Sequence, residues 1–319
     1  MMRVSRRSIV KPAVLNKGDI IGIVAPAYSF NPVKFKRGVE KIKKLGFKVK
    51  YNRLIFKRYW SMAGSAKERA AQINAMFKDK KVKAIFCAQA GYGAIRILPY
   101  LDKKIIRENP KIFIGYSDIT ILLSYLQEVA NMVVFHGPVV SSEIYEGMNR
   151  VTAGMLLRAI TKTEPLGIIF FPGLRAFKKG KARGILTGGN LSLLVRTTGT
   201  PYEIDTKNKI LFLEDIAEDL EVIDSHLMHL KLAGKFKEVK GIVFGTMVDC
   251  YDYSGRKYSI RDVLKDILYD VNVPILYGFP SGHTKKNTRR EANITLPLGV
   301  EAIIDADNPR LIIVESGVR

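Results

Sequence analysis

The chain of 319 residues has only two cysteines, four histidines and one tryptophan. Cys87 and Cys250 lie far apart in sequence beside apolar residues, which argues against a disulfide framework and favours buried thiols in a reducing cytoplasm. No apolar run approaches the roughly 20 residues that a membrane-spanning helix needs, and none follows the N-terminal arginines. We therefore expect a cytoplasmic protein without a membrane partner.

Acidic residues are also scarce, since 30 Asp and Glu face 52 Lys and Arg and give a formal charge of +22. The basic residues are scattered over many segments, and no helix-turn-helix, zinc-finger or RNA-binding motif accompanies them. We therefore expect solvated lysine-rich faces and no nucleic-acid partner. The positive field would still attract an acidic substrate.

The first half of the chain alternates short apolar runs with helical patterns, which predicts a parallel sheet covered by helices. A helix over residues 65–77 should begin with a capping box of Ser65 and Glu68, and a helix over residues 32–45 should end at Gly46. The apolar runs, which we interpret as strands, lie at residues 20–24, 49–51, 84–87, 112–115 and 133–135.

The composition changes after about residue 163. Residues 164–183 are rich in Gly, Pro, Lys and Phe without clear periodicity, so we interpret them as a connection between domains at residues 1–163 and 184–319. Helices are expected at residues 219–233 and 260–268, and the last three strands lie close enough to pair antiparallel in a mixed sheet. The expected strands of this half are residues 210–213, 241–244, 274–277, 292–296, 302–304 and 311–314.

The most informative tripeptide is residues 116–118, Tyr-Ser-Asp. It ends an apolar run and opens a helical pattern, so Ser117 would stand on a strand-to-helix turn. At such a turn the hydroxyl is lifted clear of the sheet, and free N–H groups at the helix start favour developing negative charge. Ser117 is therefore a candidate nucleophile, although a Ser-Asp pair after a strand is also common as a helix cap.

A serine nucleophile needs a base and a group that orients the base. His283 lies in a loop directly after the strand expected at residues 274–277, and Glu214 stands at the end of the strand at residues 210–213. The carboxyl ends of parallel strands collect ligands, so Ser117, Glu214 and His283 could meet at one mouth between two domains. Glu214 could equally be a salt-bridge partner and His283 a solvated loop residue, so spacing alone leaves the triad a hypothesis.

Other signals are weaker. The segment from Gly91 to Arg96 matches a dinucleotide loop only at its first two glycines. Asp224, His226 and His229 would need a further ligand to hold a metal, and His136 is interpreted as structural. We expect neither a metal nor an organic cofactor.

Several sequence segments resemble, in the same order along the chain, motifs of the serine LD-carboxypeptidase family. This family includes muramoyltetrapeptide carboxypeptidases and microcin C immunity peptidases. The resemblance runs from about Gly18 to Gly299. The matching segments are residues 18–27, 90–94, 98–102, 111–120, 136–138, 186–191, 212–215 and 282–283. It implies an α/β fold, with an N-terminal layered parallel-sheet domain of the flavodoxin or class I amidotransferase kind and a mixed-sheet C-terminal domain.

The resemblance also implies a Ser-His-Glu triad of Ser117, His283 and Glu214, with backbone N–H groups at Gly91 and Asp118 as the oxyanion hole. The implied activity is removal of a terminal D-amino acid from a muropeptide by a homodimer.

Two alternatives stay open: a microcin C-type immunity peptidase that cleaves aminoacyl nucleotide conjugates, and a non-catalytic binding protein for acidic peptides or nucleic acid. An aromatic residue at residues 164–183 that stacks on adenine would favour the former. The sequence departs from the family at Gln89 and Ala90 and at Ser225 and His226, which puts recognition of the leaving group in doubt.

Overall fold

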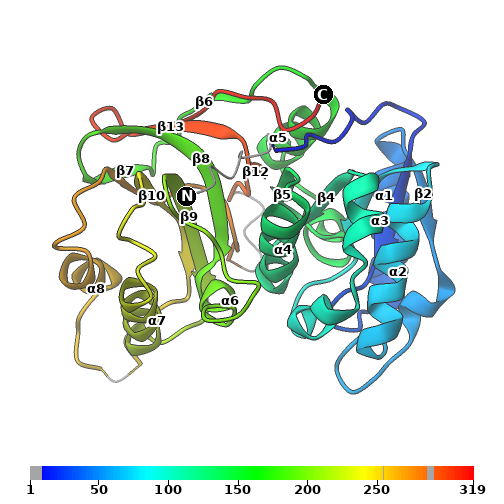
Figure 1. The fold of residues 1–319 in the computed structure, drawn as a ribbon, viewed down its shortest axis with the longest axis horizontal. Coiled ribbons are helices and arrows are strands. Elements are labelled where there is room, and N and C mark those ends of the chain that lie inside the picture. The colour runs from blue at the N-terminus through cyan, green and yellow to red at the C-terminus, as the bar shows by residue number, and fades with distance from the viewer. Residues whose placement is uncertain (1–8, 254, 286–290) are drawn as a thin grey trace, which may run out of the picture.

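The computed structural model describes residues 9–253, 255–285 and 291–319. It has two α/β lobes that lie side by side, each built on its own sheet (Figure 1). In the first sheet β5, β4, β3, β1 and β2 run parallel, and β12 is antiparallel to β5. In their order across that sheet, the strands are β12 (Leu296–Leu298), β5 (Val134–His136), β4 (Ile112–Gly115), β3 (Val82–Cys87), β1 (Ile20–Val24) and β2 (Lys48–Tyr51).

Helices cover this sheet, as the alternating pattern predicted. The capping box is confirmed, since the Ser65 side chain accepts from the Glu68 N–H and the Glu68 side chain accepts from the Ser65 N–H. Gly46, with φ of 96°, follows the end of α1 as expected. The helices of this lobe are α1 (Pro32–Lys44), α2 (Ala66–Lys78), α3 (Lys103–Glu108), α4 (Thr120–Ala130) and α5 (Arg150–Thr161), with short helical turns η1 (Arg53–Phe56), η2 (Ala94–Tyr100), η3 (Ser117–Ile119) and η4 (Val140–Ile144).

The second sheet is mixed, because parallel strands at its centre are flanked by antiparallel ones. In their order across it, the strands are β6 (Gly167–Ile169), β14 (Arg310–Ile313), β13 (Glu301–Asp305), β8 (Lys181–Asn190), β9 (Lys209–Ile216), β10 (Gly241–Val248), β11 (Ile275–Tyr277) and β7 (Arg175–Lys178). The helices of this lobe are α6 (Leu191–Val195), α7 (Leu220–Leu232) and α8 (Ile260–Ile267).

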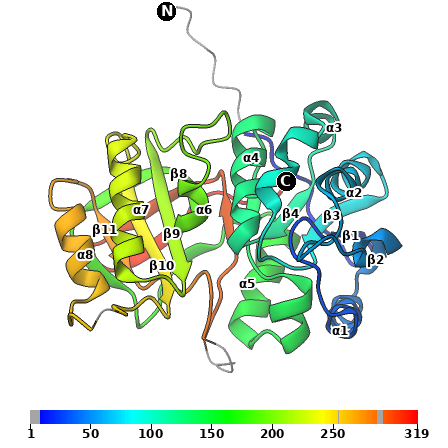
Figure 2. The same cartoon turned by 90° about the horizontal axis from the view of Figure 1, so that it is seen from below.

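One predicted pairing is wrong. Of the last three strands, β13 and β14 pair antiparallel as expected, but β12 crosses to the first sheet and pairs with β5. Figure 2 shows this orange-red strand between the two lobes. Leu296 and Leu298 are fully buried there, so burial against the first lobe explains the pairing.

Strands that the sequence pattern did not predict lie at residues 164–183, the expected domain connection. This segment contains β6, β7 and the start of β8, and these strands belong to the second sheet. β6 and β7 are short strands at the two edges of the sheet, where alternation of polar and apolar residues is weak.

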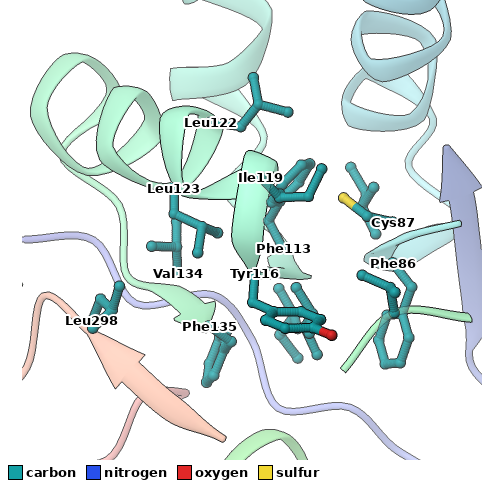
Figure 3. Close-up of a cluster of buried hydrophobic side chains, with 14 of the residues drawn as sticks. Phe86, Cys87, Phe113, Tyr116, Ile119, Leu122, Leu123, Val134, Phe135 and Leu298 are labelled. Carbon is teal, nitrogen blue, oxygen red and sulfur yellow. The ribbon is translucent and has the colours of Figure 1, made fainter. Parts of the chain in front are cut away.

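The apolar core continues directly behind the strand-to-helix turn at Ser117. Figure 3 shows Tyr116 and Ile119 from this turn in one cluster with side chains of β3, β4 and β5. Cys87 lies in this core, and both cysteines are free and buried, as predicted. None of the helices in the described ranges is long and apolar enough to cross a membrane.

Candidate active site

Ser117 stands on a sharp turn between β4 and α4. Its φ of 61° lies in the left-handed region, which residues other than glycine rarely adopt. The turn is tight, because a Cβ at Gly115 would lie 2.6 Å from Ile119. A strained serine at the end of a parallel strand is the arrangement of a nucleophile elbow.

The turn at Gly91 is held beside this elbow by the next residue, Asp118. The buried Asp118 carboxylate accepts a hydrogen bond from the Ala94 N–H at 2.8 Å. Burial raises the pKa of Asp118 to about 6 against the opposing effect of that hydrogen bond. Gly91 has φ of 121°, and a Cβ there would lie 2.1 Å from the Tyr28 ring, so only glycine fits.

Glu214 and His283 form a direct pair. Glu214 lies near the end of β9 and has no exposed surface, and its Oε2 is 2.7 Å from Nδ1 of His283. The same oxygen accepts the backbone N–H of His283 at 3.2 Å. A Cβ at Gly282 would lie 2.7 Å from that oxygen, so glycine at this position allows the loop to approach the carboxylate. Burial alone would raise the pKa of Glu214, but the neighbouring imidazoles lower it below its usual range.

The His283 ring also lies against the nucleophile turn. Its centroid is 4.8 Å from that of Tyr116, the residue before Ser117. Because Nδ1 faces Glu214, Nε2 is the nitrogen left for a serine hydroxyl or a substrate. Burial opposes charge on His283, yet the Glu214 carboxylate outweighs it and raises the pKa of the imidazole. The structure thus joins Glu214 to His283 and brings His283 to the turn that carries Ser117.

A second histidine faces the same carboxylate. His136, at the end of β5, is fully buried, and its Nε2 is 3.9 Å from Glu214 Oε1. Neither atom has a hydrogen-bond partner among the described residues. The sequence interpretation treated His136 as structural and missed this contact, although its position at the end of a parallel strand was a usable signal.

Sequence reasoning also missed a polar network next to Glu214. The Asp215 carboxylate accepts hydrogen bonds from the Asn190 side chain at 2.9 Å and from the Ser192 hydroxyl at 2.7 Å. Burial, followed by the charge of Glu214, raises the pKa of Asp215 to about 6. The Asn190 N–H donates to the Thr120 hydroxyl at 3.0 Å and so connects the second lobe to the start of α4. This network fixes the end of β9 relative to the elbow.

A cavity of about 1250 Å³ lies near the pair, although Ser117, Glu214 and His283 do not line it. Its lining reaches Thr284, next to His283, and Glu143, which accepts a hydrogen bond from the Tyr116 hydroxyl. Its remaining walls come from α1, from residues 145–149 and from the start of α5. The α1 side is rich in positive charge, with Lys34, Lys36, Arg37, Lys41 and Lys44, and the carboxylates of Glu40, Glu143, Glu146 and Glu291 also line the cavity. Within the part of the chain that the structure describes, no group of three or more His, Cys, Asp or Glu residues could hold a metal.

The two lobes and the acid–imidazole pair at a strained serine turn define a two-domain α/β hydrolase. Family models agree: the LD-carboxypeptidase N-terminal domain matches residues 21–137, and the LD-carboxypeptidase C-terminal domain matches residues 183–304. The chain belongs to the LD-carboxypeptidase family and is a carboxypeptidase-type hydrolase.

Relatives cover nearly the whole chain. A probable murein peptide carboxypeptidase of Bacillus subtilis is 37% identical over 310 residues, which are 97% of this chain and 95% of that protein. The Microcin C7 self-immunity protein MccF of Escherichia coli is 30% identical over 95% of each chain.

Solved structures agree with the two-domain fold. MccF in complex with aspartyl sulfamoyl adenosine has a TM-score of 0.89 at 28% identity, covering 97% of this chain and 100% of that one. Muramoyltetrapeptide carboxypeptidase from Oxalobacter formigenes has a TM-score of 0.81 at 26% identity, covering 92% of this chain and 97% of that one.

Proposed function

We propose that the protein is a serine LD-carboxypeptidase whose triad is Ser117, His283 and Glu214. Ser117 attacks the carbonyl carbon of the scissile amide, and His283 Nε2 takes the hydroxyl proton and returns it to the leaving amine. Glu214 holds Nδ1–H and stabilises the charged imidazole. The observation that carries this proposal is the 2.7 Å contact between Glu214 and His283, with the His283 ring against the Ser117 turn.

The tetrahedral oxyanion would be stabilised by the backbone N–H groups of Asp118 and of the Gly91 turn. Asp118 lies in the first helical turn after β4, and the Gly91 turn directly precedes η2, so both are placed where backbone N–H groups can be free to donate. The hydrogen bond between Asp118 and Ala94 supports this assignment, because it keeps the two donors at one mouth.

The proposed substrate is a muropeptide from which a terminal D-amino acid is removed. Muropeptides carry several carboxylates, and the cavity beside His283 has a positively charged wall from α1. The likeness to proteins named murein peptide carboxypeptidase and muramoyltetrapeptide carboxypeptidase supports this class of substrate.

The test is turnover of a muramoyl tetrapeptide followed by mass spectrometry. Ser117→Ala should lower kcat by about 10³-fold or more and keep the fold, because it removes the nucleophile alone. The control is Thr163→Ala, which deletes an exposed hydroxyl beyond the end of α5 and should leave kcat unchanged. Wild-type turnover in Ser117→Ala would overturn the triad.

A second candidate is hydrolysis of aminoacyl nucleotide conjugates, favoured by the likeness to MccF in complex with aspartyl sulfamoyl adenosine. An aromatic residue at residues 164–183 that stacks on adenine would favour this second function, but the position of Phe170 does not support it. Phe170 is exposed and directly follows the edge strand β6. In the sheet, β6 lies four strands from β9, which carries Glu214, and four strand spacings are about 19 Å. Offering both substrates to the same enzyme separates the two functions by the masses of the products.

The homodimer, the cytoplasmic location and the domain limits at residues 163 and 184 stay predictions. The predicted first domain begins at residue 1, and residues 1–8 lie outside the described residues. The oligomeric state is measured by sedimentation.

A further inference from the structure

Four exposed aromatic side chains gather on the loops that follow β1, β2 and β3. Their exposed fractions are 39% for Tyr28, 42% for Tyr59, 74% for Trp60 and 42% for Tyr92. The guanidinium of Arg96 lies over the Trp60 ring, 5.4 Å from its centroid. We call these five residues the aromatic platform. Large aromatic side chains are normally buried, so a group of them in solvent indicates a binding surface.

Trp60 is held in this exposed position at a conformational cost. Its φ of 55° is left-handed, which is unfavourable for a bulky residue, and it gains little burial in return. Tyr59 lies beside it, with ring centroids 4.7 Å apart and an angle of 30° between the ring planes. The two rings therefore stack on each other, and the Arg96 guanidinium lies over the Trp60 ring, while Trp60 stays 74% exposed.

Direct contacts connect the platform to the proposed oxyanion hole. The Tyr28 ring packs on Gly91, and Met62 packs on Gly93. Met62 forms backbone bridges to both Tyr28 and Tyr59. The same turn is tied to Asp118 through the Ala94 N–H. The platform is thus an outward continuation of the mouth at Ser117.

We propose that the aromatic platform binds the amino-sugar ring of a muropeptide, an inference that rests on the proposed function. In a muropeptide the sugar is attached to the end of the peptide opposite to the terminal D-amino acid. Three extended residues span at most about 10 Å, so the sugar must bind outside the immediate mouth. The platform lies there, beyond the Gly91 turn. In an aminoacyl nucleotide the base follows the reacting group more closely, so this outer position favours the sugar.

The rings bind the sugar by its apolar C–H face, and Arg96 and the tyrosine hydroxyls donate hydrogen bonds to its oxygens. Nothing in the proposed triad depends on this contact. The platform therefore contributes to binding and not to the chemical step.

Trp60 is the only tryptophan of the chain, so its fluorescence reports binding at the platform directly. Full-length Ser117→Ala protein is titrated with the peptide-free disaccharide of N-acetylglucosamine and N-acetylmuramic acid. A saturable change in emission is expected, and Tyr59→Ala in the same background should weaken it about tenfold. No saturable change, or a stronger response to adenosine than to the disaccharide, overturns the proposal. This readout needs no hydrolysis, so it stays informative if the proposed function fails.

Kinetics provide the second test. Trp60→Gly removes the ring, and glycine adopts the positive φ at this position without strain. The free energy of unfolding should therefore stay the same or rise, so a loss of activity would not result from misfolding. We expect kcat/KM to fall about tenfold for a muramoyl peptide, through KM, and to stay unchanged for the same peptide without sugar. The matched control is Tyr269→Ala, which deletes an equally exposed ring beyond α8, 72% exposed. An equal loss on both substrates, or no loss on either, overturns the platform while leaving the triad intact.

Discussion

At the scale of single residues, burial and charge act in opposite directions on the His283 imidazole. The Glu214 carboxylate prevails and raises the pKa of His283 above its usual value of about 6.5. A general base must be neutral, so the proposed mechanism loses activity as pH falls through this raised pKa. We expect the acidic limb of the kcat/KM profile above pH 6.5, measured with a muramoyl tetrapeptide.

The Glu214→Gln variant tests whether the charge of Glu214 raises the pKa of His283. It keeps the size of the side chain and removes the charge, so burial is then opposed only by the weaker effects of Glu143 and Asp215, and the pKa of His283 should fall. Proton NMR titration of the His283 ring measures the pKa in both proteins without relying on turnover. The same pKa in both would contradict the role given to Glu214.

The candidate site was predictable from the sequence only in part. Ser117 could be found from an apolar run that meets a helical pattern, because both signals are local. Glu214 and His283 lie 69 positions apart in sequence, so their positions at strand ends made their meeting only a hypothesis, and the family resemblance implied the triad. The contact of His136 with Glu214 crosses between the two sheets, so periodicity does not reveal it, and the only sequence signal was the position of His136 at the end of a parallel strand.

At the scale of elements, the Gly91 turn depends on one side-chain hydrogen bond. Asp118→Ala removes the acceptor for the Ala94 N–H and frees the turn, so kcat should fall about 10²-fold, with stability reduced by about 1–3 kcal/mol. Asp118→Asn keeps an oxygen that can accept the same bond and should retain most of the activity. Turnover and thermal unfolding measure both effects. Equal losses in the two variants would show that the negative charge matters and not the hydrogen bond.

Prediction of helices and strands succeeded where local sequence pattern alone determines the element. The parallel strands and capped helices of the first lobe alternate along the chain, so local pattern was sufficient to predict them, although β1 lies between β3 and β2 in the sheet. It failed for β12 and for residues 164–183. The former pairs with a strand about 160 positions earlier, and the latter are short edge strands with little alternation.

At the scale of the whole molecule, the proposed triad exists only while the two lobes are docked. Ser117 belongs to the first lobe, Glu214 to the second, and His283 to the chain that leads back from β11 to β12. The hydrogen bond from Asn190 to Thr120 and the contact of Thr187 with Gln127 join β8 to α4 across this seam. Buried polar contacts between lobes fix the orientation of the lobes more than they add stability.

The formal charge of +22 acts over the entire surface. Raising ionic strength from 0.01 to 0.15 M shortens the Debye length from about 30 to about 8 Å, so long-range attraction of an acidic substrate is screened. We expect kcat/KM for an acidic muropeptide to fall about three- to tenfold, with kcat unchanged, and to fall much less for the same peptide with amidated carboxyls. Stopped-flow binding and steady-state kinetics measure the effect.

A pair of charge reversals separates the cavity from the overall field. Arg37→Glu changes the wall of the cavity beside His283, and Lys265→Glu makes the same change in net charge on α8 of the second lobe. If the cavity guides the substrate, Arg37→Glu should reduce both kcat/KM and its salt dependence, whereas Lys265→Glu should change little. If the two variants lower kcat/KM equally, the attraction depends on the net charge of the protein and not on the cavity wall, because both variants change the net charge by the same amount.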